Sequence, residues 1–495
     1  MYLILICVFL SLLILYKVLQ KEKNLPPGPP AYSIPIFGHL LSLGKHPQET
    51  LLKWCQARQS DIIHCYFGQR LVIVLNNYSL IKQAFLDDNY SARAQPFIFE
   101  EHFHGKGLTY AEGERWLVHR KFAMDTLKKF GMGKFYLQGT ILSELRDVFQ
   151  HIDEQNSTPL DIKALLTHGL SNIICGFAFG ERFSHDNQEF RHIVGLIEEC
   201  FTLGSHDSWI TVFPLLRFVP MKSLRGNYKK FSKNFHEIFQ FAKKLVQNHD
   251  ENIEETRDYI DEYLKQANLD KKSNKFDSTF DMDQLITSIT NLFIGGTETT
   301  STTLRWAFIY MIENPKILKT VRQEIDDYMG DRNLFIQMED KQYLPYTTAT
   351  ILEIQRCGNI ATLGGSTMHR NLQATTLNGY SIPANSYIAA NFYACHVDER
   401  QFPHADRFDP TRFLSHDLKL VQRTQGFIPF SIGKKSCPGE SLANMELFLF
   451  FSNFIRHYDF YVVNQAEQIN SKLFYHTSLT RAPFDYQISF DRRSF

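Results

Sequence analysis

Apolar residues without charge fill the amino-terminal end of the chain. No charged residue occurs from Met1 to Tyr16, and the apolar character returns at Val18 and Leu19 before the charged residues 21–23. At about 1.5 Å of rise per residue, a helix of about 19 residues reaches about 28 Å, which matches the thin hydrocarbon core of the endoplasmic reticulum. A cleaved signal peptide has its basic residues before the apolar run, whereas here they follow it. The pattern predicts that residues 1–20 are an uncleaved, single-pass anchor in the endoplasmic reticulum membrane, with the rest of the chain in the cytosol.

Proline dominates the next segment. Residues 25–30 read Leu-Pro-Pro-Gly-Pro-Pro. Proline has no amide hydrogen and a fixed φ, so this segment cannot be helical and should form a stiff, extended spacer. We therefore expect residues 21–30 to be a basic and proline-rich linker. Since no internal repeat or low-complexity segment divides the remainder, residues 31–495 are expected to be one folded domain.

The remaining sequence changes from strand-like to helix-like periodicity. Short apolar runs at 61–67 and 71–75 are separated by a glycine and closed by two asparagines, which predicts a β-hairpin. After Trp116, apolar residues recur at three- and four-residue steps through 140–200 and 225–265, as they do on amphipathic helices. The pattern predicts an α+β fold: a mainly α-helical domain with a small β-sheet subdomain.

Two stretches interrupt the helical pattern. Residues 267–279 are rich in Lys, Asp and Ser, and we expect a surface loop there. Residues 209–221 are apolar but contain Pro214, Arg217 and Pro220, so they are too broken to span a membrane. Dipping into the bilayer surface and packing in the core are equal alternatives for this stretch.

Charge and composition exclude several classes of protein. Lys and Arg total 53 and Asp and Glu also total 53, so no net positive charge would attract the chain to nucleic acid. The 42 Phe and 22 Tyr residues suit a large apolar interior or an apolar ligand cavity. The eight cysteines form no C-x-x-C pair, which excludes the common zinc-finger and haem-attachment patterns.

One cysteine, Cys437, lies in a loop with distinctive neighbours. Residues 430–439 read Phe-Ser-Ile-Gly-Lys-Lys-Ser-Cys-Pro-Gly, and residues 440–454 have helical character. We expect Pro438 to be the first helical residue and Cys437 the cap, where the helix dipole and the loop amides favour a thiolate. Such a thiolate could be a nucleophile or a metal ligand. A nucleophile needs a base, which the nearby sequence does not offer, whereas a haem ligand needs an apolar pocket, amide donors and a cation for the propionates.

This loop resembles the haem-binding loop of the cytochrome P-450 family, F-x-x-G-x-x-x-C-x-G. Phe430, Gly433, Cys437 and Gly439 fall in register with it. The resemblance implies that Cys437 binds the iron of haem b, iron protoporphyrin IX. The family usually has Arg where Lys435 stands, so we expect a single ammonium contact to a propionate in place of a bidentate one.

Other motifs of the family occur in the same order along the chain. Trp116 and Arg120 fit W-x-x-x-R on a helix that crosses the haem edge, where both side chains would reach a propionate. Residues 353–356 fit E-x-x-R, and residues 408–413 fit the F-x-P-x-R-F that follows it. By resemblance, His369 is a further propionate partner, and a structural lock is formed by Glu353, Arg356 and Arg412.

The segment from Gly295 to Thr300 fits the oxygen-activation motif of the family. It lies on a helix expected from Asp281 to Asn314, which a proline ends. Two adjacent glycines in mid-helix each cost about 1 kcal/mol relative to alanine, so we expect them to open a gap for a ligand. The hydroxyl of Thr299 can reach the carbonyl oxygen one turn back. The resemblance implies that Thr299 and Glu298 deliver protons while oxygen is activated.

The resemblance is closest to the microsomal animal group of the family. It implies a monooxygenase that inserts one atom of O2 into a hydrophobic small molecule: a xenobiotic, a steroid or a fatty acid. Electrons would come from NADPH through NADPH–cytochrome reductase, with cytochrome b5 as a second candidate donor, because the chain has no G-x-G-x-x-G loop of its own. Basic residues in 115–134 and at 434–435 would dock an acidic donor.

Membrane lipid is a further expected partner, and nucleic acid is not. Pocket walls are expected from residues 97–103, 195–221, 293–294, 363–366 and 475–478. The alternatives for function are a redox-independent isomerase of the same fold and a non-catalytic haem- or lipid-binding protein. An intact Glu298–Thr299 pair argues against the isomerase, which does not need protons for dioxygen.

Overall fold

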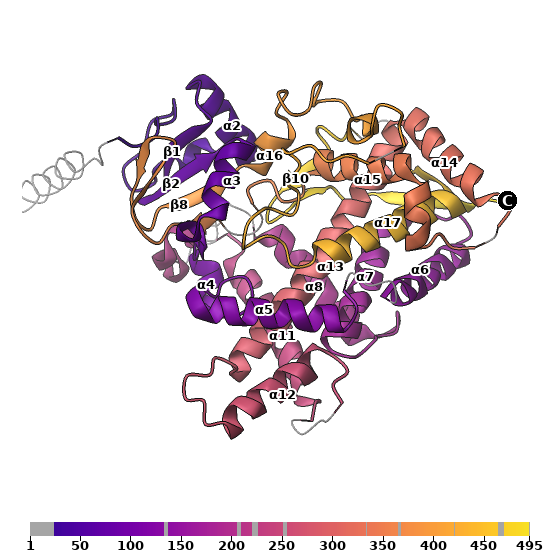
Figure 1. The fold of residues 1–495 in the computed structure, drawn as a ribbon, viewed down its shortest axis with the longest axis horizontal. Helices are drawn as coiled ribbons and strands as arrows, with labels where there is room; N and C mark the ends of the chain where they lie inside the picture. Colours follow the sequence, from indigo (N-terminus) through magenta and orange to yellow (C-terminus); the bar gives the residue numbers. More distant parts are fainter. Residues whose placement is uncertain are drawn as a thin grey trace, which may run out of the picture.

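Helices make up most of the molecule in the computed structural model, and an amino-terminal, strand-rich part lies at one side (Figure 1). The end of the chain lies at the opposite side (Figure 1). The expectation of a mainly helical protein with small sheets is confirmed. The structure describes residues 24–132, 137–204, 209–219, 226–250, 255–332, 334–364, 368–419, 421–463 and 470–494.

The largest sheet contains the predicted hairpin. β1 (Ile62–Phe67) and β2 (Arg70–Leu75) pair antiparallel, with Ile62 opposite Leu75. The strand order is β1-β2-β8-β5-β3, in which β2 and β8 (Tyr387–Ala390) run parallel. At the far edge, β5 (His369–Arg370) pairs with β3 (Ala92–Arg93), and His369 lies opposite Arg93. The sheet therefore brings two basic residues, far apart in sequence, to one edge.

Smaller sheets lie elsewhere in the chain. A three-stranded sheet has the order β4-β12-β9, and two hairpins are formed by β6 with β7 and by β10 with β11. The strands are β4 (Leu160–Asp161), β6 (Thr375–Leu377), β7 (Tyr380–Ile382), β9 (Tyr458–Val462), β10 (Tyr475–Thr477), β11 (Arg481–Pro483) and β12 (Gln487–Arg492). The β structure is thus more dispersed than a single subdomain.

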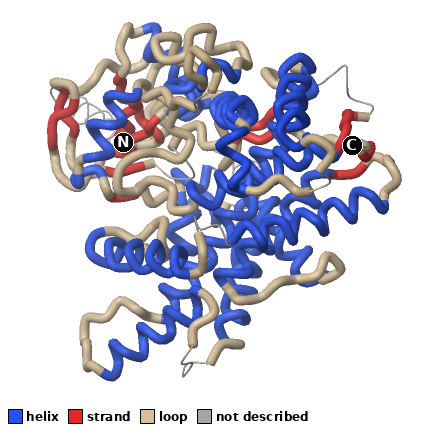
Figure 2. The backbone as a smooth tube through the Cα atoms, turned by 45° about the vertical axis from the view of Figure 1, so that its right-hand side comes forward, coloured by secondary structure: helices blue, strands red, loops and turns tan. Residues whose placement is uncertain are grey.

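Helix α13 (Met282–Glu313) runs through the middle of the helical part (Figure 1). It begins after Asp281, whose side chain accepts a hydrogen bond from the amide of Gln284, and it ends before Pro315, close to the predicted bounds. Helices α7 (Ile162–Ala178), α8 (Gln188–Leu203) and α17 (Glu440–His457) pack on it. Residues 296–300 of this helix are buried or half-buried, and helices fill most of the middle of the molecule (Figure 2).

The remaining helices surround α13 or cover the sheets. The longer ones are α2 (Pro47–Ala57), α3 (Tyr78–Leu86), α4 (Phe97–Phe103), α5 (Gly113–Lys129), α6 (Leu137–Glu154), α11 (Tyr228–Gln247), α12 (Tyr259–Lys272), α14 (Pro315–Met329) and α15 (Pro345–Gly358). The short ones are η1 (Leu40–Ser42), η2 (Asp88–Tyr90), α9 (Trp209–Val212), η3 (Pro214–Phe218), η4 (Met338–Tyr343), α16 (Phe392–His396) and η5 (Pro410–Phe413).

Aromatic rings fill the core beside α13. Phe308 meets Phe454 edge to face at 5.1 Å between ring centres and Phe490 at 5.7 Å. Such pairs contribute about 0.5–1.5 kcal/mol beyond the burial of their area. Many of the phenylalanines thus serve the interior, as their number suggested.

Helix α12 continues through Lys272, into the stretch that was expected to be a loop. The side chain of Asp258 caps its start by accepting from the amide of Asp261, and Tyr263 packs edge to face on Phe122. The loop prediction for 267–279 was therefore wrong in its first half, where Asp270 is buried and accepts hydrogen bonds from Gln266 and Ser278, which support the last turns of the helix.

The structure describes only part of the segments that were predicted to contact a membrane. Residues 1–20, the expected anchor, lie outside the described residues, and no helix among the described ones is long and apolar enough to cross a bilayer. The broken apolar stretch 209–221 is described as far as Val219. Within it Ile210 is buried, whereas Leu215 and Phe218 are 78% and 72% exposed. Core packing therefore does not account for the whole stretch.

The proline-rich segment lies against the folded body where the structure describes it. The ring Nδ1 of His64 lies 2.6 Å from the carbonyl oxygen of Pro26, and the amide of His64 donates to Pro27 at 3.0 Å. Arg58 donates to the carbonyl oxygens of Gly28 and Pro29 at 2.7 and 3.0 Å. Residues 26–29 are consequently bonded to α2 and β1 and are not a free spacer.

Candidate active site

The loop of Cys437 is held tightly against α3. Gly433 has a φ of +78°, and a Cβ atom there would lie 2.0 Å from the carbonyl oxygen of Phe85. Any side chain would therefore strain the backbone and force this contact apart. The amide of Cys437 donates to the carbonyl oxygen of Phe430 at 2.9 Å, which closes the loop. Phe430 and Gly433 thus fix the position of the sulfur.

Helix α17 begins later than predicted. Its N-cap residue is Gly439 and its first residue is Glu440, so Pro438 and Cys437 precede the helix and do not start it. A Cβ atom at Gly439 would lie 3.9 Å from the sulfur of Cys437, in ordinary contact. The chain turns at this glycine, which places the amides of the helix start beside the sulfur.

Cys437 is accessible, yet the protein around it strongly influences its thiol. It is exposed, whereas the other described cysteines are buried or half-buried. Burial by the surrounding protein nevertheless raises its pKa, while the amides of Gly439 and Glu440 and the charge of Arg120 lower it. A coordinated metal ion deprotonates a thiol outright. The site therefore suits a metal-bound thiolate better than a free one.

Lys435, in the same loop, is buried with its ammonium group against an indole ring. Its Nζ lies 4.1 Å from the centre of the Trp116 ring and donates to the carbonyl oxygen of Ala111 at 2.9 Å. Nη2 of Arg93, from β3, donates to the carbonyl oxygen of Lys435 at 3.3 Å. Three residues from separate elements thus meet at this point.

Arg120 and His369 approach the loop from two further elements. One helical turn after Trp116 on α5, Arg120 donates from Nη2 to the carbonyl oxygen of Ser436 at 2.6 Å. Nδ1 of His369 lies 2.8 Å from the carbonyl oxygen of Tyr90, and its ring stacks on Phe85 at 3.8 Å between centres. The structure therefore brings together all four residues that were predicted to contact propionates.

Positive charge exceeds negative charge in this cluster. Burial, with a contribution from Arg93 and Arg120, lowers the pKa of Lys435 to about 6, and Glu112 opposes this shift. Burial also lowers the pKa of Arg93 to about 10 and that of Arg120 below its ordinary value. A ligand with carboxylate groups would relieve this imbalance.

Unused ring nitrogens in the same place point to the same kind of ligand. Nε1 of Trp116 and Nε2 of His369 are buried and have no hydrogen-bond partner among the described residues. Nε1 of Trp116 is a donor, whereas the Nδ1 hydrogen of His369 is used by the carbonyl oxygen of Tyr90, so Nε2 of His369 donates only when the ring is protonated beside an anion. An accessible thiol, surplus cations and unused ring nitrogens together fit haem, which has an iron atom and two propionates. Arg93 belongs to this set and was missed by sequence reasoning, because no motif includes it.

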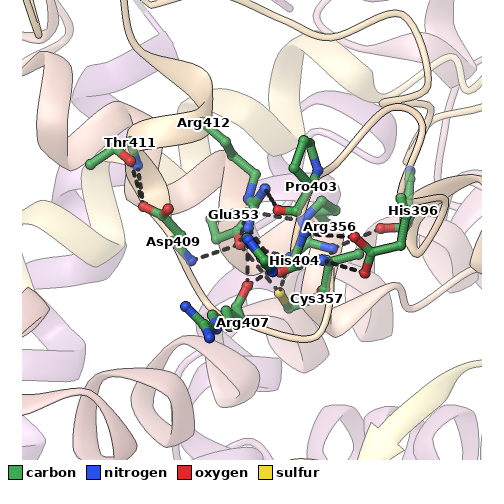
Figure 3. Close-up of polar contacts among 12 residues, drawn as sticks. Glu353, Arg356, Cys357, His396, Pro403, His404, Arg407, Asp409, Thr411 and Arg412 are labelled. Carbon is green, nitrogen blue, oxygen red and sulfur yellow. Dashed lines mark hydrogen bonds and ion pairs between the residues drawn. The ribbon is translucent and has the colours of Figure 1, made fainter.

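The three residues of the predicted lock form one buried network (Figure 3). Nε and Nη2 of Arg356 each lie 2.7 Å from the carboxylate of Glu353, and Nε of Arg412 lies 3.1 Å from it. Arg356 also donates to the carbonyl oxygens of His396 and Ala405 at 2.7 and 3.0 Å. The network ties α15 to the segment 396–412, which precedes the cysteine loop.

The two glycines of α13 have different surroundings. A Cβ atom at Gly295 would meet no atom within 4 Å, whereas one at Gly296 would lie 2.3 Å from Cδ1 of Ile174 in α7. Only Gly295 therefore leaves space beside α13, whereas Gly296 allows α7 and α13 to pack closely. The hydroxyl of Thr299 donates to the carbonyl oxygen of Gly295 at 2.7 Å, as predicted.

A cavity of about 170 Å³ lies beside this turn of α13, with Gly295 and Thr299 in its wall. Its other walls are mainly apolar and aromatic, including Phe99, Phe103, Phe201, Phe235 and Leu479. Phe99, Phe103, Cys200, Phe201 and Ile294 fall in the stretches expected to form the walls, whereas the other wall positions, Phe235 and Leu479 among them, do not. Phe293 was also expected in the walls, but it is buried against Phe179 and Phe190, away from the cavity.

Glu298 faces another way from its neighbour Thr299. Its carboxyl group is buried, does not line the cavity and accepts a hydrogen bond from the hydroxyl of Thr302 at 2.9 Å. Burial, and then the charge of Glu198, raise the pKa of Glu298 to about 7. It can therefore hold or release a proton at neutral pH.

Comparison with known proteins gives a consistent result. The sequence model of the family described as Cytochrome P450 matches residues 26–490. The chain is 33% identical to cytochrome P450 2C44 of Mus musculus, over 94% of this chain and 92% of that protein. It is 32% identical to cytochrome P450 2J5 of Mus musculus, over 98% and 95%, and to cytochrome P450 2J2 of Homo sapiens, over 95% and 91%.

Proposed function

The chain belongs to the cytochrome P450 family, and we propose that Cys437 is the residue that binds its haem iron. A member of this family is a haem-dependent monooxygenase and binds haem b through a cysteine thiolate. Support for Cys437 comes from one observation: among the described cysteines it alone is exposed, and it opens beside a buried cluster of unbalanced cations. When bound, haem supplies the redox chemistry of dioxygen.

The residues around Cys437 are assigned different roles in binding haem. We assign the propionates to Trp116, Arg120, His369 and Lys435, with Arg93 as a fifth partner. Phe430, Gly433 and Gly439 hold the loop, and the amides after Cys437 stabilise the negative sulfur. The lock of Glu353, Arg356 and Arg412 keeps the preceding segment in place. Each role can be tested one residue at a time.

Proton delivery is assigned to Thr299 and Glu298. The hydroxyl hydrogen of Thr299 is used by the carbonyl oxygen of Gly295, so its oxygen is left to accept a hydrogen bond at the cavity wall. Glu298, with its pKa near 7, supplies the proton. Aromatic and aliphatic walls keep bulk water away from the reacting oxygen.

The substrate proposed is a hydrophobic small molecule: a xenobiotic, a steroid or a fatty acid. The apolar walls of the cavity support this class. Electrons are proposed to come from NADPH through NADPH–cytochrome reductase, with cytochrome b5 as a further donor. Of the basic residues predicted to dock a donor, Arg120 and Lys435 point inward, while Lys121, Lys128 and Lys434 remain exposed.

The cellular arrangement follows from the sequence pattern. We place residues 1–20 in the endoplasmic reticulum membrane as a single span, followed by the linker 21–30 and the catalytic domain 31–495 in the cytosol. The apolar run and the charged residues after it support this arrangement.

Spectra of the reduced carbon monoxide complex test the ligand. Cys437→Ala should lose the spectrum typical of a thiolate ligand, and the matched variant Cys175→Ala, at a buried cysteine of α7, should keep it. A Cys437→Ala protein with the parental spectrum would overturn the assignment.

Turnover of the reconstituted enzyme tests the reaction. With the reductase and lipid, product should depend on NADPH, and Thr299→Ala should convert less NADPH into product and more into peroxide, with unchanged haem content. A peroxide-driven rearrangement without NADPH would favour the isomerase, and the absence of any turnover on steroids, fatty acids and xenobiotics would favour a binding protein.

A further inference from the structure

Glu298 shares its buried surroundings with a second carboxyl group, that of Glu198 in α8. Oε2 of Glu298 and Oε1 of Glu198 are both buried and have no hydrogen-bond partner among the described residues. α8 packs directly on α13. The negative charge of Glu198 is, after burial, the largest influence on Glu298, and it raises the pKa of Glu298. The two carboxyl groups therefore interact across the helix contact.

Charged side chains connect Glu198 with solvent. Nζ of Lys163, in α7, lies 3.6 Å from Oε2 of Glu198 and 3.7 Å from Oδ1 of Asp485. The side chains of Lys163 and Glu198 are each 16% exposed, whereas that of Asp485 is 72% exposed. Nη2 of Arg305, in α13, holds the same oxygen of Asp485 at 2.9 Å. One end of this series is thus in water and the other faces Glu298.

Hydroxyl groups occupy the contact between α7 and α13 nearby. Thr167 of α7 lies 2.9 Å from Ser301 of α13, oxygen to oxygen, and it also donates to the carbonyl oxygen of Lys163 at 2.7 Å. Ser171 donates to Thr297 at 3.1 Å. This contact is polar in the middle of an apolar core, and hydroxyl groups can pass protons because each both donates and accepts.

Several charged groups act on the two carboxyl groups. Lys163 and Arg305 lower the pKa of Glu298, and Lys163 also lowers that of Glu198, against the larger effect of burial. The charged and titratable groups that face the pair or its connecting residues are Asp161, Lys163, Arg305, His476 and Asp485.

We propose that Glu198 is a positioning residue that keeps Glu298 supplied with a proton, and that Lys163 and Asp485 connect this pair to solvent. The inference rests on the proton role proposed for Glu298 and Thr299. In each cycle Glu298 gives one proton toward Thr299 and the cavity and regains one from bulk water, so it returns to its starting state. Glu198 stays negatively charged throughout and favours the protonated form of Glu298.

A purely structural ion pair is the competing explanation. If Glu198 and Lys163 only held α7 against α8, their loss would lower stability and leave the pH dependence of turnover unchanged. The electrostatic role predicts a change in pH dependence with a defined sign. Loss of the negative charge of Glu198 lowers the pKa of Glu298, so Glu298 loses its proton at a lower pH.

The test compares two neighbouring glutamates in the full chain with reductase and lipid. Product and peroxide per NADPH are measured from pH 6 to 9 for Glu198→Gln and for the control Glu199→Gln. Glu199 lies at the surface, and its carboxylate accepts a hydrogen bond from Asn234. In Glu198→Gln the alkaline loss of product should move to lower pH by on the order of one unit, with haem spectrum unchanged. Glu199→Gln should follow the parent enzyme.

Two further variants distinguish a loss of charge from a loss of folding. Glu198→Asp keeps the charge and should restore the parental profile. Lys163→Met removes a positive charge and should move the alkaline loss the opposite way, to higher pH. Opposite shifts in Glu198→Gln and Lys163→Met support the proposal, whereas superimposable profiles in haem-loaded proteins, or shifts in one direction, overturn it.

Failure of this inference can be told apart from failure of the proposed function. Glu298→Gln should uncouple NADPH use from product at every pH. If it does so while Glu198→Gln behaves like the parent, only the role of Glu198 is lost. If Glu298→Gln itself stays coupled, the proposed role of Glu298 is wrong.

Discussion

A lysine that is buried beside guanidinium groups loses much of its preference for the charged form. Lys435 is in that setting, with Arg93 and Arg120 as neighbours and the face of Trp116 beneath its ammonium group. A cation on an indole face contributes about 0.5–2 kcal/mol, which is less than the energy of desolvation it must offset. Binding of an anion therefore stabilises this cluster, because it offsets the repulsion among the buried cations. The same repulsion makes the cluster selective for carboxylates.

The lysine pair of the cysteine loop offers a direct test at this scale. Lys435→Met should speed the loss of haem several-fold, because a charge-assisted hydrogen bond of about 1–2 kcal/mol is removed. Lys434→Met is the matched control, since Lys434 is half exposed and pairs with Asp88 on the surface. Transfer of haem to a scavenging protein measures the rate. Equal rates in the two variants would contradict a propionate role for Lys435.

A second buried acid, Glu446 of α17, has a consequence for stability. It accepts a hydrogen bond from the hydroxyl of Thr300 at 3.0 Å, and burial raises its pKa to about 8. In the unfolded chain the same group loses its proton near pH 4.3. The stability it contributes is therefore complete below about pH 4 and is lost as the pH rises to about 8, by about 1.4 kcal/mol per unit.

Glu446→Gln should remove this loss, because an amide keeps the oxygen that accepts from Thr300 and has no proton to release. The urea midpoint of the variant should rise above that of the parent as the pH is raised from 5 to 8. Glu154→Gln, at the exposed end of α6, is the control and should follow the parent. A constant difference between Glu446→Gln and the parent over this range would show that Glu446 is ionised in the folded protein.

Residues with a local signal could be predicted, and those defined by tertiary contacts could not. The hydroxyl of Thr299 bonds one turn back because helix geometry alone allows it. Arg93 was missed because it lies in a two-residue strand, and only the pairing of that strand with β5 brings it to the cysteine loop. The direction of Glu298, away from the cavity, also depended on helices that lie far from it in sequence.

At the scale of elements, the bounds of α13 were predictable because Asp281 and Pro315 mark its ends. The start of α17 was not, since the chain is held at Gly433 by α3 before it can turn into the helix. Polar composition alone misplaced the end of α12, where the buried Asp270 accepts hydrogen bonds from Gln266 and Ser278. The glycine pair of α13 shows the same limit: the pattern indicated a gap, but one glycine serves packing.

The contact between the cysteine loop and α3 can be broken by one methyl group. Gly433→Ala should destabilise the protein by more than about 2 kcal/mol, because a left-handed backbone and a contact with a carbonyl oxygen are both penalised. Gly195→Ala in α8 is the control: no atom lies within 4 Å of the added carbon, and the change should stabilise the helix by about 0.5–1 kcal/mol. Denaturation midpoints and haem content of the two variants check this. A fully haem-loaded and stable Gly433→Ala protein would contradict it.

Across the whole molecule, exposed apolar side chains gather near the amino-terminal sheet. Phe37 contacts Phe213 edge to face at 5.6 Å, and a Cβ at Gly68 would lie 2.5 Å from Val212, so α9 and η3 rest beside the β1–β2 turn. Ile36 is 63% exposed there, and Leu215 and Phe218 of η3, which follow Phe213 in the chain, are exposed as well. A surface of this kind suits contact with lipid.

Removal of residues 1–24 should leave weak binding to membranes through this surface. Adding Leu215→Asp and Phe218→Asp should abolish that binding, because two apolar side chains no longer enter the lipid. Phe276→Asp, at a fully exposed ring on the loop after α12, is the control and should bind as before. Sedimentation with vesicles measures the bound fraction. A truncated protein that stays in the supernatant without detergent would rule out this second contact.

The bonding of the proline-rich segment to α2 and β1 restricts how far the body can turn on its tether. With residues 1–20 proposed to lie in the bilayer, residues 21–23 are all that separates it from the described chain, and three fully extended residues span at most roughly 10 Å. Within that distance the local concentration of lipid is high. The surface with Leu215 and Phe218 therefore stays in contact with the membrane even if it binds lipid too weakly to recruit the protein from solution. The hydrogen bonds from Arg58 and His64 to residues 26–29 thus convert a point attachment into a preferred orientation of the folded body on the membrane.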